Sequence, residues 1–441
     1  MPRSGNPIEF PEGISLKTVF SDRNVFSDRT NWKLAQNPLT RAIEKARASG
    51  GKLLDLTASN PTRVGLRYDA SAILAALGSP RSMDYDPQAK GLLEARVAVA
   101  EYYQSEHDVR DLDAERIVLA TSTSEGYSFV FRLLCNAGDE LLVPKPSYPL
   151  FEFLADLQDV RLVPYPLIYD HGWQMDFPSL EKGVTARTRG VVVVHPNNPT
   201  GSYVKPQEVE QLNAFCRKRG LAVIVDEVFL DYWLGTNCGN PRCLHAPLDR
   251  RAPVQRLSRD DNTEGYIGSF AANREVLTFT LSGLSKISAL PQMKVAWIIT
   301  SGPGDQVVAA MARLEVIADT YLSMNAPVQW ALPALLELRK DIQRQLLERV
   351  RANLTELDRQ LAEQKACQRL DVEGGWYAVL RVPVTQPDEE LAIQLAREKS
   401  VLVHPGHFYD FPSDGYLVLS LITPTGEFAQ GVGGVLARLN S

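Results

Sequence analysis

The chain is organised around residues 280–297, which read TLSGLSKISALPQMKVAW. This stretch starts inside a short apolar run, VLTFTL at residues 276–281, which is typical of a buried β-strand. The run is followed by small residues and then by one lysine, Lys286. Burying an ammonium group is costly, so a lysine in this place needs an explanation. Lys286 is either a surface lysine in a polar loop or an amine kept partly neutral so that it can attack a carbonyl.

The composition is that of an ordinary globular protein with room for two domains. The chain has 441 residues, 44% hydrophobic and 23% charged, with a formal net charge of -6. This mild acidity gives no reason to expect nucleic acid or a membrane as partner. No apolar run approaches the roughly 20 residues needed to span a bilayer. The N-terminus lacks the apolar core of a secretory signal, so we expect a cytoplasmic protein.

Five cysteines are scattered along the chain, which favours reduced thiols in the cytosol. Three possible metal ligands, Cys238, Cys243 and His245, lie close together. Their spacing fits no usual zinc pattern, so we expect no metal site.

Apolar runs alternate with helical patterns over most of the chain. GVVVV at residues 190–194 and LAVIV at 221–225 are strands buried on both faces, and residues 92–103 have the spacing of an amphipathic helix. Residues 334–364 predict one long charged helix, followed by short strands and a helix. We therefore predict an α/β fold: a three-layer α/β/α large domain with a mostly parallel sheet, plus a smaller α+β C-terminal domain.

Ligands of such sheets bind at the carboxyl ends of the strands. Five predicted strand ends carry a polar or aromatic residue there: Ser124, Tyr148, Asn198, Asp226 and Lys286. The hydroxyl-rich run TSTSE at residues 121–125 opens a helix. It either caps that helix or binds an anion with the helix N-terminus, and both interpretations stay open on the sequence alone.

Three short motifs, taken together, carry a family resemblance. PNNPTG at residues 196–201 is followed by DEV at 226–228 and by SK at 285–286. In this order and spacing, the chain resembles the class I/II aminotransferases, the aspartate-aminotransferase-like, fold type I enzymes that use pyridoxal 5'-phosphate (PLP). The resemblance runs from about residue 53 to 421, as a divergent member. It implies an N-terminal arm and part of the small domain at residues 1–63, a large cofactor-binding domain at 64–335 and a small C-terminal domain at 336–441.

The resemblance implies roles for the residues at the strand ends. Lys286 would form a Schiff base with PLP and move the proton during catalysis. Asp226 would pair with the pyridinium nitrogen and keep it protonated. Asn198 would donate to the phenolate oxygen, and the ring of Tyr148 would stack on the pyridine.

The resemblance also implies a phosphate site and a dimer. Thr123 and Ser124 match the phosphate-binding helix start, and Ser285 belongs to the same cofactor-binding set. Lys294 stands where the family usually has an arginine, and it lacks that residue's bidentate fork. Tyr85 matches a tyrosine that reaches the phosphate of the partner subunit, which implies a homodimer with shared active sites.

Several positions depart from the family pattern. Gly283 stands where a phosphate-binding serine is common, and Phe229 replaces a tyrosine that donates to the phenolate oxygen. Ser59 replaces the glycine of an early substrate loop. Val418 lies where an arginine usually holds the substrate carboxylate, and a valine cannot do so.

Another arginine could replace the missing one, and the candidates are Arg381 and Arg63. With Ser59, these residues form the expected substrate-binding set. Each arginine could equally be an ordinary surface residue.

The favoured hypothesis is a PLP-dependent aminotransferase that exchanges an amino group between an amino acid and a 2-keto acid. The alternative is another PLP enzyme of the same fold, a lyase or decarboxylase acting on an unusual amino substrate. Val418, Phe229 and the long irregular segment at residues 234–272 motivate this alternative. A binding protein without enzyme activity is a third possibility, but such a protein would have little need for Lys286.

Overall fold

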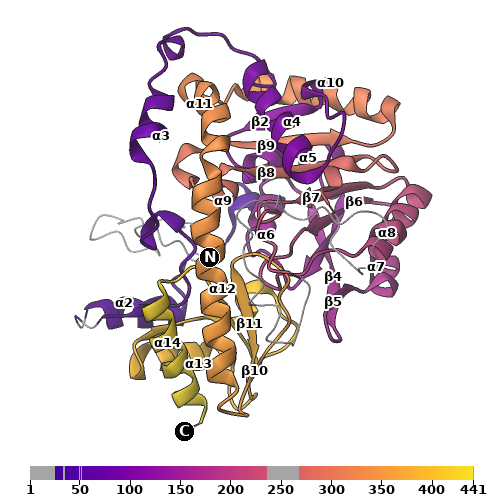
Figure 1. The fold of residues 1–441 in the computed structure, drawn as a ribbon. Coiled ribbons are helices and arrows are strands. Elements are labelled where there is room, and N and C mark those ends of the chain that lie inside the picture. Colours follow the sequence, from indigo (N-terminus) through magenta and orange to yellow (C-terminus); the bar gives the residue numbers. More distant parts are fainter. Residues whose placement is uncertain (1–24, 33–34, 49, 51, 236–267, 441) are drawn as a thin grey trace.

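The computed structural model describes residues 25–32, 35–48, 50, 52–235 and 268–440. Its largest element is an eight-stranded sheet with the order β2-β9-β8-β7-β6-β3-β4-β5 (Figure 1). In that order the strands are β2 (Ile117–Ala120), β9 (Ala296–Ser301), β8 (Thr278–Gly283), β7 (Ala222–Asp226), β6 (Thr188–Val194), β3 (Glu140–Lys145), β4 (Arg161–Tyr169) and β5 (Trp173–Met175).

The centre of this sheet is parallel, and its two edges are not. β8, β7, β6, β3 and β4 pair in parallel. β9 runs antiparallel to both β8 and β2, and β5 runs antiparallel to β4. The predicted mostly parallel sheet is therefore confirmed, and the antiparallel edges are additions that the apolar runs did not indicate.

Helices cover both faces of the sheet because its central strands are apolar on both sides. Val192 and Ile224 pack toward one face, whereas Val191 and Val223 pack toward the other, since side chains alternate along a strand. Fully burying one such side chain contributes about 1.5–3 kcal/mol. The first face carries α5 (Thr123–Leu134), α6 (Phe151–Asp156) and α10 (Gly304–Tyr321); the second carries α4 (Leu93–His107), α7 (Phe177–Gly183), α8 (Pro206–Arg219) and α11 (Ala326–Glu337), with α3 (Ala70–Leu77) packed on α11. The predicted three-layer α/β/α architecture is confirmed.

The remaining elements pack around a separate apolar core. A four-stranded antiparallel sheet has the order β10-β11-β14-β13, and a parallel pair joins β1 to β12. The strands are β10 (Gln368–Arg369), β11 (Tyr377–Arg381), β14 (Tyr416–Ser420), β13 (His404–Pro405), β1 (Leu54–Asp55) and β12 (Val401–Leu402); the helices are α2 (Pro38–Ala48), α12 (Arg339–Leu361), α13 (Asp388–Glu398) and α14 (Thr425–Leu439). A strand near the N-terminus thus pairs with one near the C-terminus, and the domain boundaries given above stay a prediction.

The long helix predicted over residues 334–364 is wrong as a single element. Instead, α11 ends at Glu337 and α12 begins at Arg339. Leu338 between them keeps helical dihedrals (φ −64°, ψ −13°) and is neither glycine nor proline. The break therefore leaves no signal in the sequence.

Among the described helices, none is long and apolar enough to cross a bilayer. The described cysteines, Cys135, Cys216 and Cys367, are free thiols. The described residues contain no group of three or more His, Cys, Asp or Glu side chains arranged for a metal. Cys238, Cys243 and His245 lie outside the described residues, as does most of the segment at 234–272.

Candidate active site

The carboxyl ends of three neighbouring parallel strands bring the central motifs together. β6, β7 and β8 lie side by side, with Val194 next to Asp226 and Asp226 next to Leu281 in the register. The backbone N–H of His195 donates to the Asp226 carbonyl at 2.8 Å, which holds the start of the PNNPTG loop beside the end of β7. Motifs that lie about 30 to 60 residues apart in the chain therefore meet at one edge of the sheet, where such sheets bind ligands.

Lys286 lies on a one-turn helix, α9 (Leu284–Ile287), directly after β8. Its Nζ lies 5.0 Å from the ring centre of Trp376 and 5.6 Å from that of Phe229. This burial lowers the pKa of Lys286 from 10.5 to about 8, although the negative charge of Asp226 opposes the change. At pH 7 about one amine in ten is then neutral, far more than for a lysine in water, and a neutral amine is a nucleophile.

Asp226 ends β7 and is 5% exposed. The Tyr127 hydroxyl donates to one of its carboxylate oxygens at 3.2 Å, and the Val228 N–H donates to the other at 3.1 Å. Burial raises the pKa of Asp226 to about 6, while these two donors and Lys286 oppose the change. Within the described ranges Asp226 forms no ion pair shorter than 4 Å, so its carboxylate could pair with a cation from a ligand.

Tyr148 lies close enough to Asp226 to sense its charge, and Asn198 belongs to the PNNPTG loop that starts beside the end of β7. The side-chain oxygen of Asn198 is buried and has no hydrogen-bond partner among the described residues, which is unusual for a buried polar atom. The Tyr148 ring packs edge-on against Phe151, with ring centres 5.9 Å apart. Burial and the charge of Asp226 raise the pKa of Tyr148 to about 12, so its hydroxyl stays protonated at neutral pH. A buried carboxylate with no cation paired to it among the described residues and a partly buried aromatic ring are groups that a charged aromatic ligand such as PLP would satisfy.

Thr123 and Ser124 are the first two residues of α5. Ser122 caps this helix by accepting a hydrogen bond from the Glu125 N–H at 3.2 Å. Tyr127, which contacts Asp226, is one turn further along the same helix, so the start of α5 lies close to the carboxylate. The N-terminus of a 12-residue helix attracts anions, and this position suits the phosphate of PLP.

The residues around Lys286 explain one departure from the family pattern. A side chain at Gly283 would meet the Val295 carbonyl oxygen at 2.6 Å and the Ala296 Cα at 2.8 Å. A serine therefore has no space at this position. Ser285 is partly buried beside Lys286, whereas Lys294 is exposed and adopts a left-handed conformation with φ 54°.

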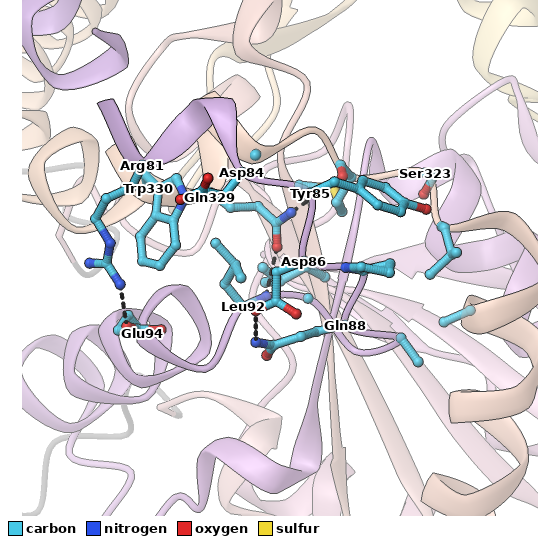
Figure 2. A pocket seen from close by; sticks show the side chains of 18 of the residues that line it. Arg81, Asp84, Tyr85, Asp86, Gln88, Leu92, Glu94, Ser323, Gln329 and Trp330 are labelled. Atoms are coloured by element: carbon cyan, nitrogen blue, oxygen red, sulfur yellow. Dashed lines mark hydrogen bonds and ion pairs between the residues drawn. The ribbon is translucent and has the colours of Figure 1, made fainter. Parts of the chain in front are cut away.

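Tyr85 lies away from this cluster, on the rim of a cavity of about 320 Å³ (Figure 2). Its side chain is 83% exposed. The same cavity is lined by Ser323, whose hydroxyl donates to the Glu125 carboxylate on α5 at 2.8 Å. Tyr85 is therefore on the side of the molecule near the start of α5, and the structure brings it into no contact with Lys286.

The structure does not bring Arg381 to the lysine. Arg381 is exposed at the far end of β11, with its guanidinium 5.8 Å and 5.9 Å from the ring centres of Tyr169 and Tyr416. Trp376, which contacts Lys286, lies five residues earlier, about 16 Å along an extended chain. The substrate-binding role expected for Arg381 is therefore not supported.

Ser59 and Arg63 belong to the loop that follows β1. The Ser420 hydroxyl donates to the Ala58 carbonyl at 2.5 Å and fixes this loop against the end of β14. Ser420 pairs with Tyr377, the neighbour of Trp376, so the loop approaches the lysine side of the sheet. Arg63 is exposed at the end of a short 3-10 helix, Pro61–Arg63, and forms no ion pair with any described residue.

Val418, at the place of the family arginine, is fully buried. It pairs with Val379 on β11 and with His404 on β13. The Nδ1 atom of His404 lies 3.0 Å from the Tyr409 hydroxyl, and burial lowers the pKa of His404 to about 4. At neutral pH this wall therefore carries no positive charge.

Sequence reasoning named Tyr148 and Phe229 but missed two other aromatic residues of the site, Trp376 and Tyr127. Trp376 packs on Phe229 with ring centres 5.2 Å apart, and Tyr127 contacts Asp226. Tyr127 lies four residues after Thr123, one helical turn, and this spacing was the available signal. No sequence pattern indicated that Trp376 lies near Lys286, because the apolar pattern of a strand does not show which other sheet its side chains will contact.

Comparisons with known proteins agree on one family. A family model described as "Aminotransferase class I and II" matches residues 51–424. The glutamate-pyruvate aminotransferase AlaA of Escherichia coli is 26% identical over 302 residues, 68% of this chain and 67% of that protein. The alanine aminotransferase of Mycobacterium tuberculosis is 25% identical over 410 residues, 90% of this chain and 88% of that protein. The solved structure of the Pyrococcus furiosus alanine aminotransferase superposes with a TM-score of 0.78 at 21% identity, covering 94% of this chain and 99% of that one.

Proposed function

This chain belongs to the class I and II aminotransferases and is a PLP-dependent transaminase, and we propose that Lys286 is the residue that carries its cofactor and transfers the proton. The observation that carries this proposal is the position of Lys286. Its amine is held among aromatic rings after β8, with a pKa lowered to about 8. An amine that gains and loses a proton near neutral pH can act both as nucleophile and as general base.

The surrounding residues fit PLP, which when bound supplies an electron sink next to the reacting carbon. We propose that Asp226 holds the proton on the pyridine nitrogen, because no described residue forms an ion pair with its buried carboxylate. The Asn198 amide would bond the ring oxygen and Tyr148 would stack on the ring. Phe229 offers no hydroxyl, so the ring oxygen has one donor fewer than in relatives with a tyrosine at this position.

The proposed phosphate site lies at the start of α5. Thr123 and Ser124 supply backbone N–H groups and hydroxyls there, with Ser285 and Lys294 as further candidates from the lysine loop. Gly283 cannot contribute a side chain, since the backbone of Ala296 fills the space. The phosphate would thus depend more on the helix N-terminus than in relatives with an additional serine and arginine.

The substrates are an amino acid and a 2-keto acid. Which amino acid and which keto acid they are is a matter of proposal. The relatives named above act on alanine, or on glutamate and pyruvate, which makes alanine, glutamate and pyruvate the first substrates to test. We propose that Ser59 and Arg63, on the loop fixed by Ser420, bind the substrate carboxylate in place of the family arginine. The neutral wall around Val418 supports this assignment, as does the exposed guanidinium of Arg63, which forms no ion pair within the part of the chain that the structure describes.

We also propose a cytoplasmic homodimer in which Tyr85 reaches the phosphate of the second subunit. The 83% exposure of the Tyr85 side chain supports this, because a large aromatic residue on the surface is typical of an interface.

The experiment mixes purified holoenzyme with each amino acid in the absence of a keto acid and records the visible absorbance. A transaminase converts the bound cofactor once and stops, without releasing ammonia. Continuous ammonia or carbon dioxide release would instead support a lyase or decarboxylase. Lys286→Ala should lose the visible absorbance, whereas the exposed control Lys340→Ala should keep it; an unchanged Lys286→Ala spectrum would refute the assignment.

A further inference from the structure

Two side chains donate hydrogen bonds to the backbone of the turn that carries Lys286. α9 is a single turn with few backbone hydrogen bonds of its own: the Ser288 N–H donates to the Leu284 carbonyl at 3.2 Å, and the Ala289 N–H donates to the Lys286 carbonyl at 3.1 Å. The Tyr232 hydroxyl donates to the Lys286 carbonyl at 2.6 Å. The Gln343 amide nitrogen donates to the Ile287 carbonyl at 2.8 Å. These two bonds come from different parts of the chain, the segment after β7 and the long helix α12.

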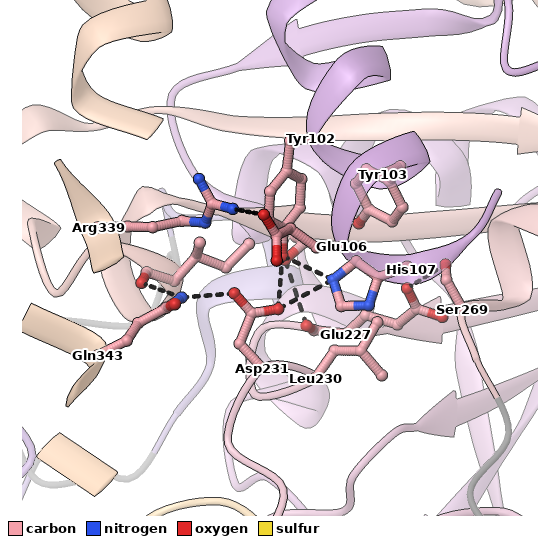
Figure 3. A network of polar contacts seen from close by, with 12 residues as sticks. Tyr102, Tyr103, Glu106, His107, Glu227, Leu230, Asp231, Ser269, Arg339 and Gln343 are labelled. Atoms are coloured by element: carbon pink, nitrogen blue, oxygen red, sulfur yellow. Dashed lines mark hydrogen bonds and ion pairs between the residues drawn. The ribbon is translucent and has the colours of Figure 1, made fainter. Parts of the chain in front are cut away.

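Gln343 is itself fixed by a buried carboxylate. Its amide nitrogen donates a second hydrogen bond to Asp231 at 2.5 Å (Figure 3). Asp231 also accepts a bond from the Tyr102 hydroxyl at 2.6 Å and lies 2.9 Å from Nε2 of His107. Both hydrogens of the amide are thus used on two acceptors, which leaves Gln343 one orientation.

Asp231 is ionised at neutral pH. Burial on its own would raise the pKa of Asp231, but His107, Tyr102 and Arg339 together lower it below its usual value. Arg339 lies one turn before Gln343 on α12 and pairs with Glu106 at 2.5 Å, near the end of α4 (Figure 3). A hydrogen bond to an ionised acceptor is about twice as strong as a neutral one, so the Asp231 carboxylate holds Gln343 firmly.

We propose that Gln343 and Tyr232 are positioning residues for transamination, and that Asp231, oriented by His107 and Tyr102, holds Gln343 in place. Neither Gln343 nor Tyr232 contacts a reacting atom. They fix the backbone of a helix too short to be stable alone, and thereby the point from which the lysine side chain reaches the substrate. Reacting groups need to be held within about 0.5 Å, and a loss of that precision lowers the rate about tenfold or more. This inference rests on the proposed role of Lys286.

The chain offers a closely matched control for Gln343. Gln360 lies on the same helix, and its amide nitrogen also donates to one carboxylate, Glu356 at 2.8 Å, and to one backbone carbonyl, Ala429 at 2.9 Å. Gln360 is remote from the lysine turn, at the end of α12 that packs on α14. Gln343→Met and Gln360→Met therefore remove the same kinds of bond, in one case behind Lys286 and in the other not.

The test compares the two holoenzymes by thermal unfolding, by kcat and KM, and by the pH at which the visible absorbance of bound PLP titrates. Both variants should lower Tm by similar amounts. Only Gln343→Met should lower kcat, about tenfold or more with little change in KM, and move the spectroscopic titration. A Gln343→Met enzyme that matches Gln360→Met in kcat and in its titration overturns the proposal.

Tyr232→Phe provides a second route if Gln343→Met does not fold. It removes one hydroxyl without changing the ring, and Tyr165→Phe is its control, since the buried Tyr165 hydroxyl donates to the Val192 carbonyl at 2.8 Å. Tyr232→Phe should move the titration and lower kcat, and Tyr165→Phe should do neither; identical behaviour of the pair refutes the proposal. Failure of the Lys286 assignment is separate, because it would appear as visible absorbance that survives in Lys286→Ala.

Discussion

Replacing Lys286 with methionine should stabilise the cofactor-free protein at neutral pH. Methionine keeps an unbranched side chain of similar length but has no charge to bury among Trp376 and Phe229. Burial lowers the pKa of Lys286 from 10.5 to about 8. That difference corresponds to about 3 kcal/mol of unfavourable free energy for the charged form, and because the side chain is only partly buried we expect about 1–3 kcal/mol.

The effect depends on pH with a defined sign. Between about pH 8 and 10.5 the folded state binds fewer protons than the unfolded state, so the stability of the cofactor-free protein rises with pH in this window. The charged lysine therefore lowers the free energy of unfolding by its full amount below about pH 8 and by nothing above about pH 10.5. Lys286→Met removes it, so the free energy of unfolding of the variant should exceed that of the original protein at neutral pH and converge with it near pH 10.5.

Urea unfolding of both cofactor-free proteins, at about pH 7 and at about pH 10, measures this difference. Lys340→Met is the control, because Lys340 is exposed and its one ion pair with a described residue is the surface contact to Glu337 at 2.6 Å. It should leave the free energy of unfolding nearly unchanged at both pH values. A Lys286→Met protein that is less stable than the original at pH 7, or that gains the same stability at both pH values, would show that burial of the lysine charge does not destabilise the fold.

Three further outcomes follow from the site. Gly283→Ala should lower the free energy of unfolding by about 1–3 kcal/mol because a Cβ would meet backbone atoms at 2.6 and 2.8 Å, whereas Gly426→Ala, with open space around it, should change it by less than about 1 kcal/mol; equal effects in denaturant titrations would contradict this. Arg63→Met should raise KM for the amino acid about tenfold or more through loss of a charged hydrogen bond, while Arg381→Met should leave KM within about twofold, and the reverse result would move the carboxylate site to β11. Asp226→Asn should weaken PLP retention about 30-fold or more in equilibrium dialysis, since the neutral amide cannot pair with a ring cation; unchanged retention would remove Asp226 from the cofactor site.

The sequence motifs predict that Asn198, Asp226 and Lys286 lie together, because this placement depends only on which strands are neighbours in the sheet. Apolar runs that end in Asn198, Asp226 and Lys286 indicate parallel strands, and parallel neighbours place their ends at one edge. The same runs cannot reveal that β9 is antiparallel, since a strand buried on both faces looks alike in either direction.

Contacts that depend on tertiary structure were beyond sequence reasoning. Arg381 shares a strand with the neighbour of Trp376, but only the length and direction of β11 show that it lies at the wrong end. His107 and Asp231 are separated by more than a hundred residues, and no periodicity links them. Gln343 is an unremarkable polar residue on a charged helix until α12 is seen to pass behind the lysine turn.

We propose that Lys286 is the residue bonded to the cofactor. The most direct test is to reduce the holoenzyme with borohydride, digest it and locate the PLP-modified lysine by mass spectrometry. We expect the modification on Lys286 alone. Modification of Lys294 or of any other lysine in its place, or of none, would contradict it.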